Sequence, residues 1–339
     1  MSKHPPVTNL RQLPAAIVLL ATLIFAAPAR AEWLYRDEAI MGTRCAVELW
    51  AADRAAGEAA IAAVFADMRR IDALMSTYNP DSEISRVNAQ AAKEPVAISA
   101  ELFSLLETSR LYSRLSAGVF DITYASVGYL YDYRRHRHPD DTALAAALPG
   151  VDYRQLKLDA AARTVAFGKP GMRIDLGGIA KGYAVDRGID LLKARGFGRA
   201  MVNAGGDTRV VGDRFGKPWM IGIRHPDDKE KVVLRIPLED AAFSTSGDYE
   251  RFFDEGGVRY HHIIDPKTGR SPHAVRSVTI IASTATRTDG LSKTVFILGP
   301  QAGLEFIDKL PDADAIVIAA DGKVSYSRGL QAPGAPPSQ

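Results

Sequence analysis

Apolar residues recur at helical spacing in three long stretches of the chain. The stretch 55–74 places apolar side chains from Ile61 to Leu74 on one face, which predicts a helix packed on the core. The stretches 100–115 and 179–195 have the same period, and Ser99 is a typical N-terminal cap for the first of them. These patterns predict three amphipathic helices that cover a common core.

Other apolar runs are short or alternate with polar residues, as β-strands do. The predicted strands are 39–50 with a break at 41–43, 172–175, 200–203, 219–224, 232–236, 259–264 and 278–282. The hydroxyl-rich segment 244–248 reads as a turn, and Asp289 is expected to open an apolar helix over 291–298. Helices and strands together predict an α+β fold.

The two ends of the chain differ from the rest. Lys3 and Arg11 precede an apolar run over 13–27, and Ala29-Arg30-Ala31 has the small-x-small pattern of a signal-peptidase site. We therefore expect a cleaved signal peptide over 1–31 and export to the periplasm; an uncleaved membrane anchor is the alternative. Residues 32–328 are expected to form one domain, and the proline-rich stretch 329–339 a disordered tail.

Composition narrows the function classes. The chain has 339 residues, of which 47% are hydrophobic and 24% charged, which is typical of a globular protein. Without the signal peptide, 39 basic residues stand against 40 acidic ones, so no basic field for nucleic acid exists. Cys45 is the only cysteine, which excludes an internal disulfide, and its alternating surroundings predict a buried strand residue.

A glycine-rich unit over 173–207 carries the first candidate chemistry. Gly177-Gly178 lies where a predicted strand turns into a helix, so backbone N–H groups and the positive end of the helix dipole face one crevice. Asp175 and Lys181 add a carboxylate and an ammonium beside it. The unit predicts an anion-binding site, with an ordinary tight turn as the alternative reading.

Asp289 adds a hard oxygen donor to this picture. Magnesium takes few protein ligands and shares its remaining positions with phosphate and water, so an aspartate beside a phosphate-binding turn indicates a magnesium–phosphate site. Each of these aspartates alone is more often a helix cap or a surface charge. Their occurrence together favours the functional interpretation.

Several separated blocks of the sequence, taken in order, resemble the ApbE family of FAD:protein FMN transferases. The matching blocks are 41–43, 118–123, 175–186, 203–207, 245–249, 262–269 and 288–299. The resemblance implies a single α+β, T-fold-like domain of two lobes, with mixed sheets, flanking helices and FAD in a cleft between the lobes. It also implies transfer of the FMN half of FAD to a threonine or serine hydroxyl of a partner protein, with release of AMP.

The resemblance also implies which residues bind FAD. The residues expected at the flavin are Met41 and Tyr78, those expected along the adenosine are Val119, Phe120 and Asp121, and those expected to hold the nucleotide are Asp175 and Lys181.

The same resemblance implies the metal site and the base. The Gly178 carbonyl and the Asp289 carboxylate match the magnesium positions, and His262 matches a histidine that we interpret as the base for the acceptor hydroxyl. The family usually has threonine or serine four residues after the aspartate, where this chain has Lys293. Either Ser292 or water then completes the metal shell, or the Lys293 ammonium partly replaces the second ligand.

Three functions remain open from the sequence. The first is a magnesium-dependent FMN transferase that acts on a periplasmic subunit of an NQR, RNF or nitrous-oxide-reduction complex, as the resemblance implies. The second is a non-catalytic FAD-binding or carrier protein, which Lys293 keeps open. The third is a magnesium-dependent FAD pyrophosphatase that gives FMN and AMP.

Overall fold

The computed structural model describes residues 1–2 and 31–330 of the chain. The predicted signal peptide and the predicted tail lie almost entirely outside the described residues, so both stay predictions. No helix in the described part of the chain is both long enough and apolar enough to cross a membrane.

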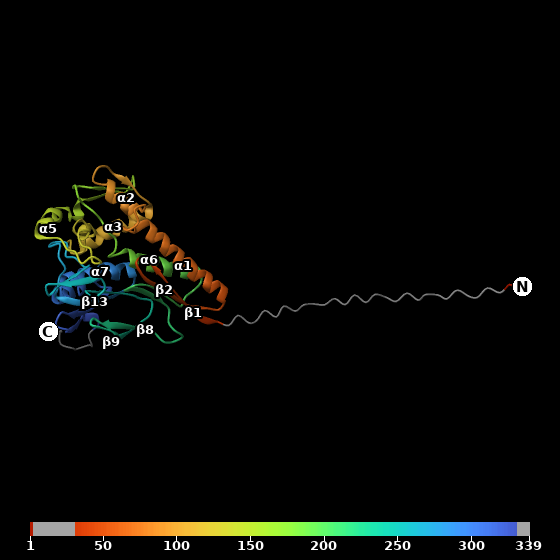
Figure 1. Cartoon of the computed structure of the whole chain (residues 1–339). Helices are drawn as coiled ribbons and strands as arrows, with labels where there is room; N and C mark the ends of the chain where they lie inside the picture. Colours follow the sequence, from red (N-terminus) through yellow and green to blue (C-terminus); the bar gives the residue numbers. More distant parts are fainter. Residues whose placement is uncertain (3–30, 331–339) are drawn as a thin grey trace.

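One large antiparallel sheet organises the molecule (Figure 1). Its eight strands lie in the order β1-β2-β6-β7-β10-β13-β14-β15, so the first two strands of the chain form one edge and the last two form the other. The strands are β1 (Glu32–Ile40), β2 (Thr43–Ala51), β6 (Ala200–Ala204), β7 (Asp207–Val211), β10 (Ala242–Gly247), β13 (Val275–Ala282), β14 (Ala313–Ala319) and β15 (Val324–Tyr326). All strand pairs among the described residues are antiparallel, a detail that the expectation of mixed sheets did not capture.

The break predicted inside 39–50 is a β-hairpin. Ile40 pairs with Thr43, and the two residues between them, Met41 and Gly42, have φ of 55° and 69°. Two left-handed residues are what a two-residue hairpin turn needs to match the twist of its strands. The turn therefore holds the Met41 side chain at one end of the sheet.

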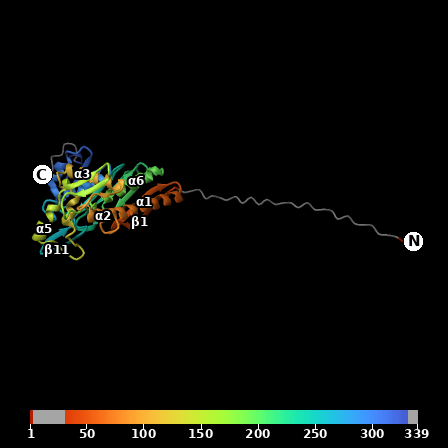
Figure 2. The same ribbon diagram turned by 90° about the horizontal axis from the view of Figure 1, so that it is seen from above.

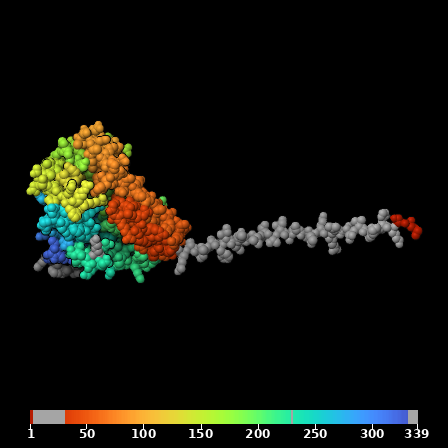
Figure 3. Space-filling model, in the orientation of Figure 1, coloured from red at the N-terminus to blue at the C-terminus, as the bar shows by residue number. Residues whose placement is uncertain are grey.

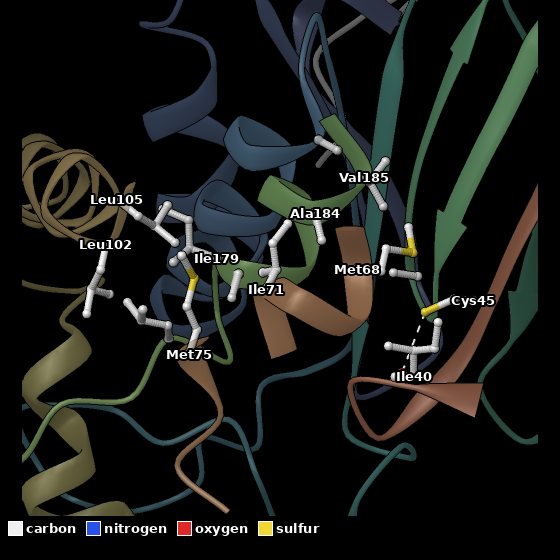
Figure 4. Close-up of a cluster of buried hydrophobic side chains, with 14 of the residues drawn as sticks. Ile40, Cys45, Met68, Ile71, Met75, Leu102, Leu105, Ile179, Ala184 and Val185 are labelled. Atoms are coloured by element: carbon white, nitrogen blue, oxygen red, sulfur yellow. Dashed lines mark hydrogen bonds between the residues drawn. The ribbon is translucent and has the colours of Figure 1, made fainter. Parts of the chain in front are cut away.

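Helices cover one face of the large sheet. They are α1 (Arg54–Met75), α6 (Ala180–Ala194), α7 (Ala285–Leu298) and α8 (Pro300–Ile307). α6 lies between α1 and α7, and α7 packs directly on β10 and β13. Figure 4 shows Met75, Leu102 and Ile179, from three different segments, pointing into one apolar cluster, all of them buried. The predicted burial of Cys45 is confirmed, and burial raises the pKa of its thiol to about 11.

The opposite face of the large sheet is covered by a hairpin of β8 (Trp219–His225) and β9 (Asp228–Leu238). Trp219 and Leu238 pack there on Val210 of the large sheet. The next residue, Val211, packs on the helix side, as alternation along a strand requires.

A smaller lobe sits above the large sheet (Figures 1 and 2). Its elements are α2 (Glu83–Gln90), β3 (Val96–Ala97), α3 (Ala100–Leu115), η1 (Ile122–Tyr124), α4 (Ala125–Gly128), α5 (Asp141–Ala147), η2 (Leu148–Gly150), η3 (Tyr153–Gln155), β4 (Leu156–Asp159) and β5 (Thr164–Phe167). The predicted cap of α3 is confirmed, since the Ser99 hydroxyl accepts the Leu102 N–H at 3.2 Å. The fold is thus α+β with flanking helices, as expected.

The hairpin of β11 (Phe252–Glu255) and β12 (Val258–His261) is a separate two-stranded sheet, and a short η4 (Arg328–Leu330) ends the described residues. Residues just after β12 contact the smaller lobe, because Ile264 packs with Val127 and Leu144. In the space-filling view the yellow segment of the smaller lobe lies directly on the cyan segment of the larger one (Figure 3).

Candidate functional site

Side chains, and not a neighbouring strand, hold the segment that leads into α6. The Asn88 side chain accepts the Ile174 N–H at 2.8 Å and donates to the Ile174 carbonyl at 2.9 Å. The predicted strand over 172–175 is therefore wrong, because a side chain takes the backbone groups that a strand partner would use. The turn at Gly177-Gly178 follows directly before α6, as predicted.

The Asp175 carboxylate organises this turn. It accepts hydrogen bonds from the Gly177 N–H at 2.7 Å, the Thr77 hydroxyl at 2.9 Å and the Tyr124 hydroxyl at 3.3 Å. Burial, followed by the nearby Asp175 charge, raises the pKa of Tyr124 well above its usual value, so this hydroxyl stays a donor. Asp175 thus joins the smaller lobe to the α6 turn; its contact with a nucleotide stays a prediction.

Lys181, in the first turn of α6, lies between two buried carboxylates. Its ammonium nitrogen is 3.0 Å from an Asp207 oxygen and 3.8 Å from an Asp289 oxygen, and it donates to the Gly177 carbonyl at 3.2 Å. Burial alone would lower the pKa of Lys181, but the two carboxylates raise it above its usual value. The ammonium is therefore charged and held next to the glycine turn.

Asp289 is fully buried at the contact between α6 and α7. One of its oxygens pairs with the Lys293 ammonium, one turn further along α7, and the other accepts the Gly182 N–H at 3.1 Å. Burial opposes its charge, but Lys181 and Lys293 lower the pKa of Asp289 below its usual value, so the carboxylate is ionised. The expectation that Asp289 opens the helix is wrong, because α7 begins at Ala285.

Gly182 makes this arrangement possible. A Cβ at this position would lie 2.2 Å from the Ala285 carbonyl oxygen and 2.9 Å from the Asp289 Cβ. Only glycine lets α6 approach α7 closely enough for the backbone of one helix to bond to a carboxylate of the other.

A row of hydroxyl pairs lies beside Asp289. Ser244 pairs with Thr288 at 2.6 Å and Ser246 with Ser292 at 2.8 Å, so β10 and α7 are joined by side chains. The predicted turn at 244–248 is therefore wrong: alternate hydroxyls of a strand point at α7. The Ser292 hydroxyl also donates to the Asp289 carbonyl at 2.8 Å, so it is both buried and bonded.

The residues predicted for magnesium lie near one another. A Cβ on Gly178 would lie 3.8 Å from the Lys293 Cγ, and the Lys293 ammonium pairs with Asp289. Among the residues described, no group of three or more His, Cys, Asp or Glu side chains could hold a metal. One carboxylate with carbonyl and hydroxyl oxygens nevertheless suits magnesium, which shares its shell with phosphate and water. The set fits the ion, with the Lys293 ammonium as its competitor for Asp289.

His262 lies just beyond β12 and carries a free ring nitrogen. Its Nδ1 is buried without a hydrogen-bond partner among the residues described, while its backbone N–H donates to the Arg251 carbonyl at 3.1 Å. Burial, then the charges of Lys293 and Arg251, lowers the pKa of His262 to about 3. The imidazole is neutral near pH 7, which is the form that a base requires.

The neighbouring histidine points elsewhere. His261 is buried, and its Nε2 lies 2.8 Å from the Pro272 carbonyl oxygen. Adjacent side chains of an extended chain point in opposite directions, so at most one of the two histidines is expected to face the site.

The residues predicted for FAD are spread over both lobes. Tyr78 is 86% exposed, whereas Val119 and Phe120 are buried, with the Phe120 ring 3.4 Å from where a Cβ on Gly178 would lie. The Asp121 carboxylate accepts the Thr123 N–H at 2.8 Å and the Tyr153 N–H at 2.9 Å, so it caps η1 and fastens a second segment. These contacts are structural, and the predicted roles along FAD stay predictions.

The described cavities do not coincide with these residues. One, of about 520 Å³, lies beside Trp33 and Trp219, and another, of about 210 Å³, lies beside Asp308 and Asp314. Neither is lined by a residue predicted for the site, so the position of FAD in a cleft between the lobes rests on the family resemblance.

Two charged residues of the site were missed by sequence reasoning. Asp207 stands in a block that carries the resemblance, and its place after Gly205-Gly206 was the available signal for a carboxylate opposite Lys181. Arg251 stands in no recognised pattern, and only the folded chain brings it to His262.

Comparison with known proteins gives one consistent result. The ApbE family model matches residues 41–317. The FAD:protein FMN transferase of Treponema pallidum is 35% identical over 321 residues, 89% of each chain, and that of Vibrio cholerae is 34% identical over 246 residues, 70% of this chain and 72% of the other. The solved ApbE protein of Thermotoga maritima has a TM-score of 0.81 at 32% identity, and flavin transferase ApbE from Vibrio cholerae has 0.78 at 30%; each alignment covers 88% of this chain and 98% of the other.

Proposed function

The chain belongs to the ApbE family, and from this membership we propose that it is an FAD:protein FMN transferase. In this proposal the acceptor is a threonine or serine hydroxyl of a partner protein, the second product is AMP, and the reaction depends on magnesium. The observation that carries the proposal is His262, a neutral imidazole with an unbonded Nδ1 at a place where lysine and arginine charges converge. Such a place suits a pyrophosphate and a base beside it.

His262 takes the proton of the acceptor hydroxyl, whose oxygen attacks the phosphorus on the flavin side of the pyrophosphate. The bond from that phosphorus to the bridging oxygen breaks, AMP leaves with the electron pair, and the proton passes from His262 to solvent or to AMP. Lys181 holds a positive charge beside the phosphates throughout.

In this proposal Asp289 and the Gly178 carbonyl would hold magnesium, with Ser292 or water beside them. When bound, it supplies positive charge that stabilises the pyrophosphate oxygens. Lys293 makes this chain different, because its ammonium already pairs with the Asp289 carboxylate that would hold the ion.

The proposal is tested by mixing the chain from Glu32 onward with FAD, magnesium and an acceptor domain that carries an exposed threonine or serine segment. We expect mass spectrometry to find FMN on the acceptor, with AMP released in equal amount and both lost in excess chelator. AMP and FMN without an adduct would identify a pyrophosphatase instead.

A second candidate function rests on one observation, the pairing of Lys293 with Asp289. If this ammonium permanently takes the place of the metal, the chain binds FAD without transferring FMN. Bound FAD with no turnover in the same assay would identify such a carrier protein.

Replacing Lys293 with threonine is expected to tighten magnesium binding by about tenfold, because a competing charge is removed and a hydroxyl is added. Calorimetric titration of magnesium into the FAD-loaded protein measures this. Lys309→Thr, an exposed lysine after α8, is the matched control and should leave magnesium binding unchanged. Weaker binding by Lys293→Thr would mean that the ammonium supports the site.

The place of the reaction and the partner are part of the proposal. The predicted signal peptide over 1–31 supports export to the periplasm. The family resemblance supports an acceptor that is a subunit of a membrane redox complex of the NQR, RNF or nitrous-oxide-reduction type.

A further inference from the structure

Arg251 is an exposed arginine for which the structure shows no ion-pair partner among the described residues. It lies directly before β11, and its guanidinium has no hydrogen-bond or ion-pair partner among the residues that the structure describes. Nearby arginines are paired: Arg259 with Asp254 at 3.0 Å and Arg276 with Asp248 at 2.9 Å. Unlike these two neighbours, the exposed guanidinium of Arg251 is open to a ligand.

Backbone and side-chain contacts fix where this free guanidinium lies. The Arg251 carbonyl accepts the His262 N–H at 3.1 Å, which ties the residue to the proposed base. Its Nη2 is 3.3 Å from where a Cβ on Gly42 would lie, so the side chain reaches the turn that carries Met41. Arg251 thus lies between His262 and the turn expected at the flavin.

The charges around His262 do not cancel. Lys181 pairs with Asp207 and Lys293 pairs with Asp289, so each ammonium has its own carboxylate. Arg251 adds a positive charge that no carboxylate of the described residues neutralises. The buried Nδ1 of His262, which bonds to no described residue, lies within reach of the Arg251 charge. An anion bound here would accept hydrogen bonds from the Arg251 guanidinium. An acceptor hydroxyl held beside this anion would then donate a hydrogen bond to the Nδ1 of His262.

We propose that Arg251 binds the phosphate on the flavin side of FAD, the phosphate that is transferred. The inference rests on the proposed function. It assigns this phosphate because Arg251 lies beside the Met41 turn and the proposed base, whereas Lys181 lies at the glycine turn before α6. A guanidinium donates two parallel hydrogen bonds to one phosphate, which fixes its orientation for attack.

Comparing FMN with riboflavin isolates this contact, since the two differ only by the phosphate. Flavin fluorescence measures the dissociation constants of both for the wild type, Arg251→Gln, Arg251→Lys and the control Arg235→Gln. Arg235 is an exposed arginine on β9, so its replacement makes the same change of net charge away from the site. We expect the preference of the wild type for FMN to fall by about 10- to 100-fold in Arg251→Gln, with riboflavin binding unchanged. Arg251→Lys should keep part of the preference, and Arg235→Gln all of it.

The possible outcomes separate the inference from the proposed function. Parallel loss of FMN and riboflavin binding in Arg251→Gln would give Arg251 a structural role at the turn and overturn the inference. The inference would also be overturned if the wild type did not prefer FMN over riboflavin, or if Arg251→Gln kept the full preference. In either case, binding of FAD by the wild type would leave the proposed function standing. A wild type that binds no FAD would overturn both.

Discussion

Replacing His262 with alanine is expected to lower the rate of FMN transfer by about 10²- to 10⁴-fold, the usual contribution of a general base. FAD binding should change by only a few fold, because the imidazole acts on the acceptor hydroxyl and not on FAD. Mass spectrometry of the acceptor after single turnovers measures the rate, and flavin fluorescence measures FAD binding.

The control for this prediction is His273→Ala, which removes an exposed histidine eleven residues further along the chain. It should transfer FMN at the wild-type rate. Normal transfer by His262→Ala would exclude His262 as the base, and equal loss of transfer in both variants would point to general destabilisation.

The low pKa of His262 gives this prediction a pH signature. A base whose pKa is about 3 in the free protein stays neutral at every pH well above 3, so protonation of the imidazole should not lower kcat/KM for FAD between pH 8 and pH 5. Lys293 and Arg251 help to hold the pKa down, and the negative charge of a bound pyrophosphate opposes them. FAD should therefore raise the pKa of His262 and make it a stronger base when the substrate is present.

The helices could be predicted from the sequence because their apolar period is local. Ala100–Leu115 begins after the predicted Ser99 cap, and α6 was placed within one residue at each end. The strands near the site were harder. Ser244 and Ser246 resemble turn residues in sequence, and only the position of α7 makes them inward-facing strand residues.

The site itself was predicted in part. The family resemblance named Lys181 and Asp289, and the structure brings them within 3.8 Å of each other. The ion pair between Lys293 and Asp289 follows from their separation of four residues once both lie inside one helix, but Asp289 had been expected at a helix start. Arg251 carried no local signal, because its neighbours at the site come from the Met41 turn and from His262.

Replacing Asp289 with asparagine is expected to have the largest effect on the fold itself. The carboxylate is fully buried, faces Lys181 and Lys293, and accepts the Gly182 N–H. Asparagine keeps the shape of the aspartate side chain but removes the negative charge that the Lys181 and Lys293 ammonium groups face. Removing one partner of a buried ion pair costs about 3–5 kcal/mol, which urea denaturation should detect as a loss of unfolding free energy. Asp312→Asn, which breaks a half-exposed pair with Arg287, should cost about 1 kcal/mol or less.

Loss of stability and loss of function at Asp289 can be separated by a second change. In Asp289→Asn/Lys293→Met the surplus ammonium is gone and an apolar chain of similar length replaces it, so much of the unfolding free energy should return. Magnesium binding, measured by calorimetry, and FMN transfer should both stay absent, because the only carboxylate proposed for the ion is still missing. A double variant that regained magnesium-dependent transfer would show that the ion binds elsewhere. A single variant as stable as the wild type would show that the Lys181, Lys293 and Asp289 charges do not support the fold.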